Sequence, residues 1–165
     1  MFSRIVVPVD GSALAEQAFP QVVSLATTFD VPVAFVRVID ISRLQMYGHN
    51  LLEMAVERIH HALAEERRSA LDYLDRLKSK FSEYGITVSS TLLQGFVNEA
   101  ILGYVSGDDL LVLASRAHSG LDRAHLGSTA SALIQYSSVP VLVVPPRAFS
   151  THSIPTPRSG DRFVT

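Results

Sequence analysis

Short runs of Val, Ile and Leu recur along the chain and alternate with longer amphipathic segments. These runs are mostly too continuous for strands with one exposed face, and they lie at residues 5–9, 33–39, 86–93, 110–114 and 141–144. Segments with helical periodicity separate them, at residues 13–28, 52–84, 97–105 and 128–136. This alternation predicts an α/β fold, a single doubly wound open parallel sheet of five strands with helices on both faces.

Two of the helical segments carry further signals. Ser12 is a good N-cap for the first. Pro20 inside that segment would remove a helical hydrogen bond, so we expect a kink near residues 16–20 or two shorter helical pieces. The second is long and charged, with Glu65 to Arg68 facing outward. Its expected inward positions are Ala62, Ala70, Leu74, Leu77 and Phe81.

Length and composition define one domain. The 165 residues, 47% of them hydrophobic, are enough for one well-buried core and too few for two. We assign residues 1–146 to this domain. After Pro145 and Pro146 the composition changes to Ser, Thr, Pro and Arg, which predicts a disordered C-terminal tail over residues 147–165.

Charge and cysteine content narrow the classes of partner. The 14 basic and 16 acidic side chains nearly cancel, and no Lys/Arg block could follow a phosphate backbone, so nucleic acid is not expected as a partner. No apolar run approaches the ~20 residues that span a bilayer, and the chain begins with a strand-like segment rather than a signal peptide. The absence of cysteine excludes disulfides and suits the cytoplasm, where we expect the protein.

Ligands of doubly wound sheets bind outside the carboxyl ends of the strands, where the strand order reverses. Asp10, after the first strand, could accept hydrogen bonds from ribose hydroxyls or hold Mg²⁺ near phosphates, or it could simply cap the first helix together with Ser12. Gly127 and Ser128 open the last helix, whose free N–H groups could hold a phosphate. Residues 40–50 could form a flap over this edge or a plain connection.

Candidate catalytic and metal-binding groups are weak by comparison. We expect no metal site built from the six histidines, because none of them forms a set with ligand spacing. Neither Gly11-Ser12 nor Gly127-Ser128 continues as a nucleophile elbow, and there is no Walker-type lysine or committed general base. The sequence therefore predicts no catalytic residues and no enzyme, with weak ATP hydrolysis as a minor option.

Several of these motifs together resemble the universal stress protein family. The resemblance rests on Val7-Pro-Val-Asp-Gly-Ser12, Phe35-Val-Arg-Val38, Gly95, the stretch from Leu111 to Ser128, and Val139-Pro-Val-Leu-Val-Val144. It implies a five-stranded doubly wound domain of the adenine nucleotide alpha hydrolase-like type. It also implies a homodimer, and a site for ATP or another adenine nucleotide.

The resemblance also implies roles for individual residues. Asp10 would meet the ribose, Val38 the adenine, and Ser115, Gly127, Ser128 and Thr129 the phosphates. The glycines of the family's Gly-x-x-Gly phosphate loop fall on Ala114 and Ala117, where a Cβ can block close backbone approach or a positive φ. The full expected site is Pro8, Val9, Asp10, Val38, Ala114, Ser115, Arg116, Ala117, Gly127, Ser128 and Thr129.

The sequence is compatible with two functions. The first is a cytoplasmic stress-response protein that binds an adenine nucleotide, ATP foremost, as a regulatory ligand with little or no turnover. In it, Arg116 could supply a cation to a phosphate or could simply face solvent. The alternative, motivated by the two alanines, is a dimeric scaffold that has lost nucleotide binding. In both, the last strand, Val141 to Val144, is expected at a sheet edge, where it would pair with its copy.

Overall fold

Five parallel strands form one sheet in the order β3-β2-β1-β4-β5, so the strand order reverses between β1 and β4. The computed structural model describes residues 1–42, 53–115 and 126–145, of which residues 53–56 only as backbone. The elements are β1 (Arg4–Pro8), a 3₁₀ helix η1 (Ala15–Ala18), α1 (Phe19–Phe29), β2 (Val33–Asp40), α3 (Glu53–Ser82), β3 (Val88–Gly95), α4 (Val97–Tyr104), β4 (Asp109–Ala114), α5 (Ser128–Tyr136) and β5 (Val141–Val144). The predicted α/β class, strand number and parallel sheet are confirmed.

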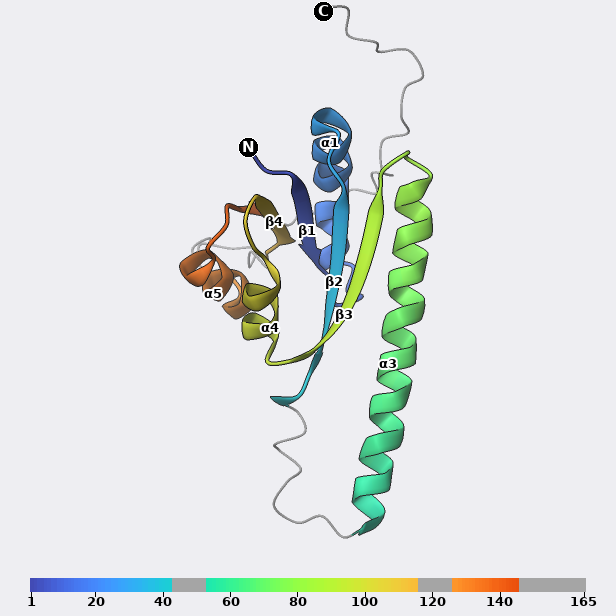
Figure 1. The fold of residues 1–165 in the computed structure, drawn as a ribbon. Helices are drawn as coiled ribbons and strands as arrows, with labels where there is room; N and C mark the ends of the chain where they lie inside the picture. Colours follow the sequence, from blue (N-terminus) through green and yellow to red (C-terminus); the bar gives the residue numbers. More distant parts are fainter. Residues whose placement is uncertain (43–52, 116–125, 146–165) are drawn as a thin grey trace, which may run out of the picture.

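Helices cover both faces of the sheet (Figure 1). Successive strand side chains point to opposite faces, so Ile5 and Val7 pack with α1 and α3, whereas Val6 packs with α4 and α5. On the α1/α3 face, three buried rings meet edge to face with centroids 4.7 to 5.6 Å apart, and they come from α1, β2 and α3: Phe19, Phe35 and Phe81. Burial of apolar surface on both faces explains why the central strands read as continuous apolar runs.

The first helical segment divides at the expected place. A 3₁₀ helix ends at Ala18 and α1 begins at Phe19, so Pro20 lies in the first turn of α1. The N–H that proline lacks would have no helical partner there, and the proline therefore costs little. The expected break between residues 16 and 20 is confirmed as two helical pieces.

One expectation for the long helix is wrong. Ala70, Leu74, Leu77 and Phe81 of α3 are buried as predicted, whereas Ala62 is exposed. The helix extends past the carboxyl edge of the sheet (Figure 1), so its N-terminal part has no strand beneath it. Amphipathic periodicity alone could not indicate where the sheet ends.

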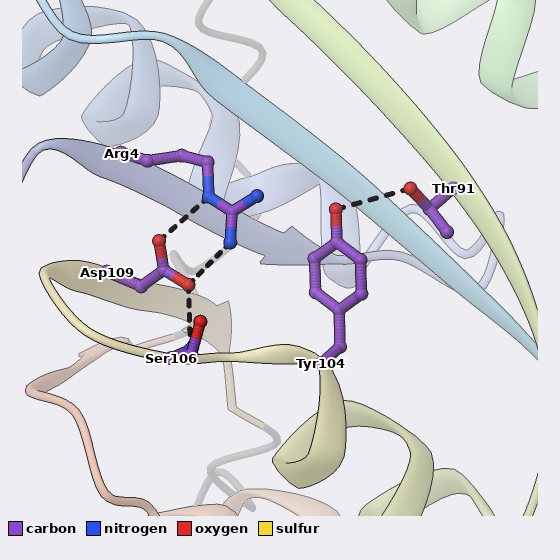
Figure 2. Close-up of polar contacts among 5 residues, drawn as sticks. All are labelled: Arg4, Thr91, Tyr104, Ser106 and Asp109. Atoms are coloured by element: carbon purple, nitrogen blue, oxygen red, sulfur yellow. Dashed lines mark hydrogen bonds and ion pairs between the residues drawn. The ribbon is translucent and has the colours of Figure 1, made fainter.

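A network of polar side chains connects strands near the amino edge of the sheet (Figure 2). Arg4 of β1 donates two hydrogen bonds, of 2.8 and 2.6 Å, to the carboxylate of Asp109 on β4, which also accepts the Ser106 N–H at 3.0 Å. The Arg4 guanidinium lies 5.3 Å from the centroid of the Tyr104 ring, whose hydroxyl bonds Thr91 at 3.2 Å. The hydrogen bonds from Arg4 hold the pKa of Asp109 below its ordinary value.

Strand β5 lies at one edge of the sheet, as predicted. The predicted tail, residues 147–165, and most of the segment proposed as a flap lie outside the described residues. Among the helices that the structure describes, none has the length and apolar character needed to cross a membrane.

Candidate functional site

A cleft of about 520 Å³ opens at the carboxyl edge of the sheet, between the ends of β1, β2 and β4 and the N-terminal turn of α5. It lies at the reversal of strand order, where ligands of doubly wound sheets bind. Its volume falls in the range of ordinary small-molecule sites. Every described residue of the predicted site lines it: Pro8, Val9, Asp10, Val38, Ala114, Ser115, Gly127, Ser128 and Thr129. Arg116 and Ala117 lie outside the described residues.

The sequence analysis missed the apolar wall of this cleft. Part of that wall could have been read from spacing, because Val36 lies two positions before Val38 on the same face of β2, and Val97 and Ile101 lie one helical turn apart on α4. The remaining part depends on which helix crosses which strand. Beyond the predicted residues, the lining comprises Ser12, Leu14, Ala15, Val36, Val97, Ile101, Leu113, Ala130 and Leu133.

The loop after β1 folds back on itself where it borders the cleft. The Ser12 N–H donates to Asp10 Oδ1 at 2.9 Å, and the Ala15 N–H donates to Ser12 Oγ at 3.2 Å. Gly11 between them has a φ of +82°, which favours glycine. Asp10 therefore organises the turn before the first helix and does not cap the helix itself, whose N-cap is Leu14. It also lines the cleft, where the other role left open for it places it.

The end of β4 places a buried hydroxyl in the cleft. The backbone N–H of Ser115 donates to the Val144 carbonyl at 3.0 Å, and this residue is only 3% exposed. Its Oγ has no hydrogen-bond partner within the described part of the chain. An unpaired buried hydroxyl is unfavourable and uncommon, and a ligand in the cleft could complete the hydrogen bonding of this atom. Buried Asn98 Oδ1 on α4, outside the cleft lining, also has no described partner.

The first alanine of the degenerate loop fits its position without backbone strain. Ala114 is the last residue of β4, and among the described non-glycine residues only Asp30 has a positive φ. The objection that a Cβ at Ala114 would force another backbone shape therefore does not apply to this residue. Ala117 lies outside the described residues, so whether its Cβ would change the shape of the loop stays an expectation from the sequence.

The N-terminal turn of α5 borders the same end of the cleft. Gly127 precedes the helix with a φ of −55°, and a methyl group built there would meet no described atom within 4 Å. The first N–H groups of any α-helix lack partners inside the helix, and they attract anions. Ser128 and Thr129 add hydroxyls, so this end of the cleft is rich in donors.

Formal charge is sparse in the cleft. Among the described lining residues, only Asp10 is charged, so only one carboxylate is available there for a Mg²⁺ ion. No group of three or more metal-ligating side chains occurs within the described residues. His60 and His61 are exposed on α3, and the other four histidines lie outside the description.

The comparisons with known proteins agree with this fold and cleft. Residues 1–145 match the universal stress protein family. The chain is 30% identical over 146 residues to universal stress protein MJ0531 of Methanocaldococcus jannaschii, covering 87% of this chain and 82% of that protein. The solved structure of protein MJ0577 from the same organism superposes with a TM-score of 0.71 at 26% identity, covering 89% of this chain and 98% of the other.

A further solved structure shares the fold and contains a ligand. It is the universal stress protein of Archaeoglobus fulgidus in complex with dAMP, with a TM-score of 0.58, 19% identity, and coverage of 87% of this chain and 97% of that one. The family match spans nearly all of the sequence that the structure describes. This chain belongs to the universal stress protein family.

Proposed function

We propose that this chain is a cytoplasmic stress-response protein that binds an adenine nucleotide, ATP foremost, as a regulatory ligand. Support comes from the cleft at the strand reversal, from its donor-rich end, and from the adenine nucleotide held by a family member of the same fold. The observation that carries the proposal is the Ser115 hydroxyl, which is buried in the cleft without a partner among the described residues.

The order of the strands suggests how the nucleotide would lie. Val36 and Val38 on β2, with Val97 and Ile101 on α4, offer an apolar surface for the base. Asp10 follows β1, the next strand, and its carboxylate could accept hydrogen bonds from ribose hydroxyls. The end of β4 and the start of α5 come next, with Ser115 and the helix N–H groups for the phosphates. Base, ribose and phosphates would thus follow the sheet edge from β2 to β4.

Turnover is not part of this proposal. Phosphoryl transfer needs positioned cations and a residue that orients the nucleophile. The described lining contributes one carboxylate and otherwise neutral groups. Mg²⁺ bound between Asp10 and the phosphates would supply charge, and Arg116, outside the described residues, could add to it. These groups suit binding of ATP with little or no hydrolysis.

The proposed assembly is a homodimer through β5. That strand lies at the edge of the sheet, where unpaired backbone groups can pair with a second copy. Leu142 on β5 and Tyr136 on the adjacent α5 are exposed apolar side chains that such a contact would cover.

A second candidate is the dimeric scaffold without a nucleotide. Alanines in place of the two loop glycines favour it, because a Cβ can deny a phosphate its close approach to the backbone. The strain-free backbone of Ala114 weakens this argument for one of the two positions.

The test begins with purified protein that is denatured, so that bound nucleotide is released and identified by anion-exchange chromatography. Emptied protein is then titrated calorimetrically with ATP, ADP, AMP and cyclic AMP, with and without Mg²⁺. We expect ATP to bind, and the double variant Ala114→Gly/Ala117→Gly to change its Kd by no more than a few fold. A wild type that binds none of the four nucleotides, together with a double variant that binds ATP, would show that the two alanines abolish nucleotide binding and would favour the scaffold instead.

A further inference from the structure

A second cluster of polar side chains lies behind the loop that borders the cleft. Val36 and Val38 of β2 face the cleft, so Arg37 between them points to the opposite face of the sheet, where α3 packs. Tyr73 of α3 and Glu16 of η1 lie on that same side. The segment from Asp10 to Ala15 thus borders the cleft and leads directly to Glu16 of this cluster.

Tyr73 contacts both other side chains of this cluster, and Arg37 also approaches the loop. The Tyr73 hydroxyl donates to Glu16 Oε1 at 3.0 Å. The Arg37 guanidinium carbon lies 5.5 Å from the centroid of the Tyr73 ring, within the range of a cation–π contact. A methyl group on Gly11 would lie 3.3 Å from Arg37 Nη1. The guanidinium therefore packs closely against the loop at Gly11, the residue with a positive φ.

The Tyr73 hydroxyl is the hydrogen-bond donor of this cluster. It is 8% exposed, and burial and then the hydrogen bond to Glu16 raise the pKa of its phenol well above the ordinary value of 10.0. The hydroxyl therefore keeps its proton at physiological pH. A second guanidinium, that of Arg76, lies 5.9 Å from the same ring.

We propose that Glu16, Arg37 and Tyr73 form a latch that holds the Asp10 to Ser12 turn in the shape in which it lines the cleft, and that they are positioning residues for the nucleotide. The inference rests on the proposed function. The turn's own hydrogen bonds join residues two or three positions apart. The latch instead joins Glu16, at the start of η1, to α3, and it places Arg37 of β2 against Gly11 of the turn. The latch residues act through the loop and are absent from the cleft lining.

The energetic consequence follows from pre-organisation. A ligand that binds one loop conformation has an apparent affinity reduced in proportion to the population of that conformation. Removing one net hydrogen bond that favours it lowers that population, and ATP binding should weaken by up to about tenfold, the limit reached when the binding conformation is the minor one.

The test compares tyrosine-to-phenylalanine variants at two places in the full-length protein. Tyr73→Phe removes the hydroxyl bonded to Glu16, and Tyr104→Phe, the matched control, removes the hydroxyl bonded to Thr91, which is not part of the cleft lining. ATP affinity, measured by calorimetry, should fall measurably, by up to about tenfold, in the first and stay unchanged in the second. Equal affinities for the two variants would overturn the proposal.

Variants of Glu16 provide a second test of the latch. Glu16→Ala should weaken ATP binding as much as Tyr73→Phe, and the double variant should be no weaker than either single one, because both changes remove the same bond. Glu16→Gln should keep near wild-type affinity, because an amide oxygen still accepts from the hydroxyl. Additive losses, or a failure of Glu16→Gln to restore binding, would contradict the latch.

Failure of the proposed function remains distinguishable. If the wild type binds no adenine nucleotide, the latch is judged by amide hydrogen exchange at Ser12 and Ala15. Tyr73→Phe should speed exchange at these amides several fold relative to wild type, and Tyr104→Phe should not. Unchanged exchange in Tyr73→Phe would then overturn the latch by itself.

Discussion

The two edges of the sheet differ in how their buried polar side chains are paired. At the amino edge, Asp109 accepts two bonds from Arg4 and one from Ser106, and Tyr104 bonds Thr91 (Figure 2). At the carboxyl edge, Ser115 is just as buried, yet its hydroxyl has no partner within the described residues. Paired groups stabilise the fold without help, whereas an unpaired buried group leaves a deficit that a ligand can remove.

The largest expected effect is at the paired edge. Arg4→Met should lower the free energy of unfolding by about 2–3 kcal/mol, since it leaves the Asp109 carboxylate buried without its cation. Arg4 is one-third exposed, with a side-chain accessibility of 33% against 4% for Asp109, so the loss should be below that for a fully buried pair. Urea unfolding measures it, with exposed Lys78→Met as the control that should change stability little.

Arg4→Met also tests whether the polar network at the amino edge affects nucleotide binding at the carboxyl edge. Arg4→Met should leave ATP affinity within about twofold of wild type, because the network lies outside the cleft lining. A stability loss under about 0.5 kcal/mol would show that the ion pair contributes no more than an ordinary surface pair. A large loss of affinity would show that the two edges are coupled.

Lowering the pH should weaken the interaction of Asp109 with Arg4 at the amino edge of the sheet. The pKa of Asp109 is lowered in the folded state, so its contribution is present above its ordinary value of 3.8 and is lost as the pH falls through the folded value. The wild type should therefore exceed Asp109→Asn in stability at pH 6, and the gap should narrow as the pH falls below about 4. Urea unfolding at several pH values measures the gap, and a constant gap would contradict this assignment. Asp72→Asn, exposed on α3, is the control expected to have little effect on stability.

The smallest effect is expected at the carboxyl edge, where one substitution should keep or slightly raise stability and should lower ligand affinity. Ser115→Ala should leave the melting temperature of the emptied protein unchanged or slightly raised, because it removes a hydroxyl without a described partner. It should also weaken ATP binding by about 1 kcal/mol, or about fivefold, through loss of one hydrogen bond to the ligand. Exposed Ser24→Ala on α1 is the control. A clear drop in the stability of the emptied variant would mean that Ser115 has a structural partner.

Local patterns were sufficient for most of the fold. The strand bounds differ from the expected ones by at most two residues, and the break before Pro20 falls where proline chemistry places it. The error at Ala62 has a tertiary cause, because helical periodicity continues where the sheet beneath α3 has ended. Arg4, Glu16 and Tyr73 gave no sequence signal, since their partners lie on other elements of the chain.

The residues at the ends of strands were predictable for a different reason. Once alternation implies a parallel sheet, the carboxyl ends of its strands must lie at one edge, so Asp10 and Ser115 had to share that edge. The strand order, which makes β1 and β4 neighbours, then brings the two residues close together. Spacing could have placed Val36 on the face of Val38 and Val97 on the face of Ile101, but the packing of α4 against β2, which joins the two into one apolar wall, depends on the tertiary structure.

The sequence by itself determined the class of fold, the edge that carries the cleft and the residues at the strand ends, because periodicity and turn chemistry are local properties of the chain. Only the tertiary structure decided that Ala114 is unstrained, that the Ser115 hydroxyl is buried without a described partner, and that Tyr73 reaches Glu16 across 57 positions of sequence. Burial and pairing depend on neighbours that only folding brings together, and these neighbours set the energies on which binding depends.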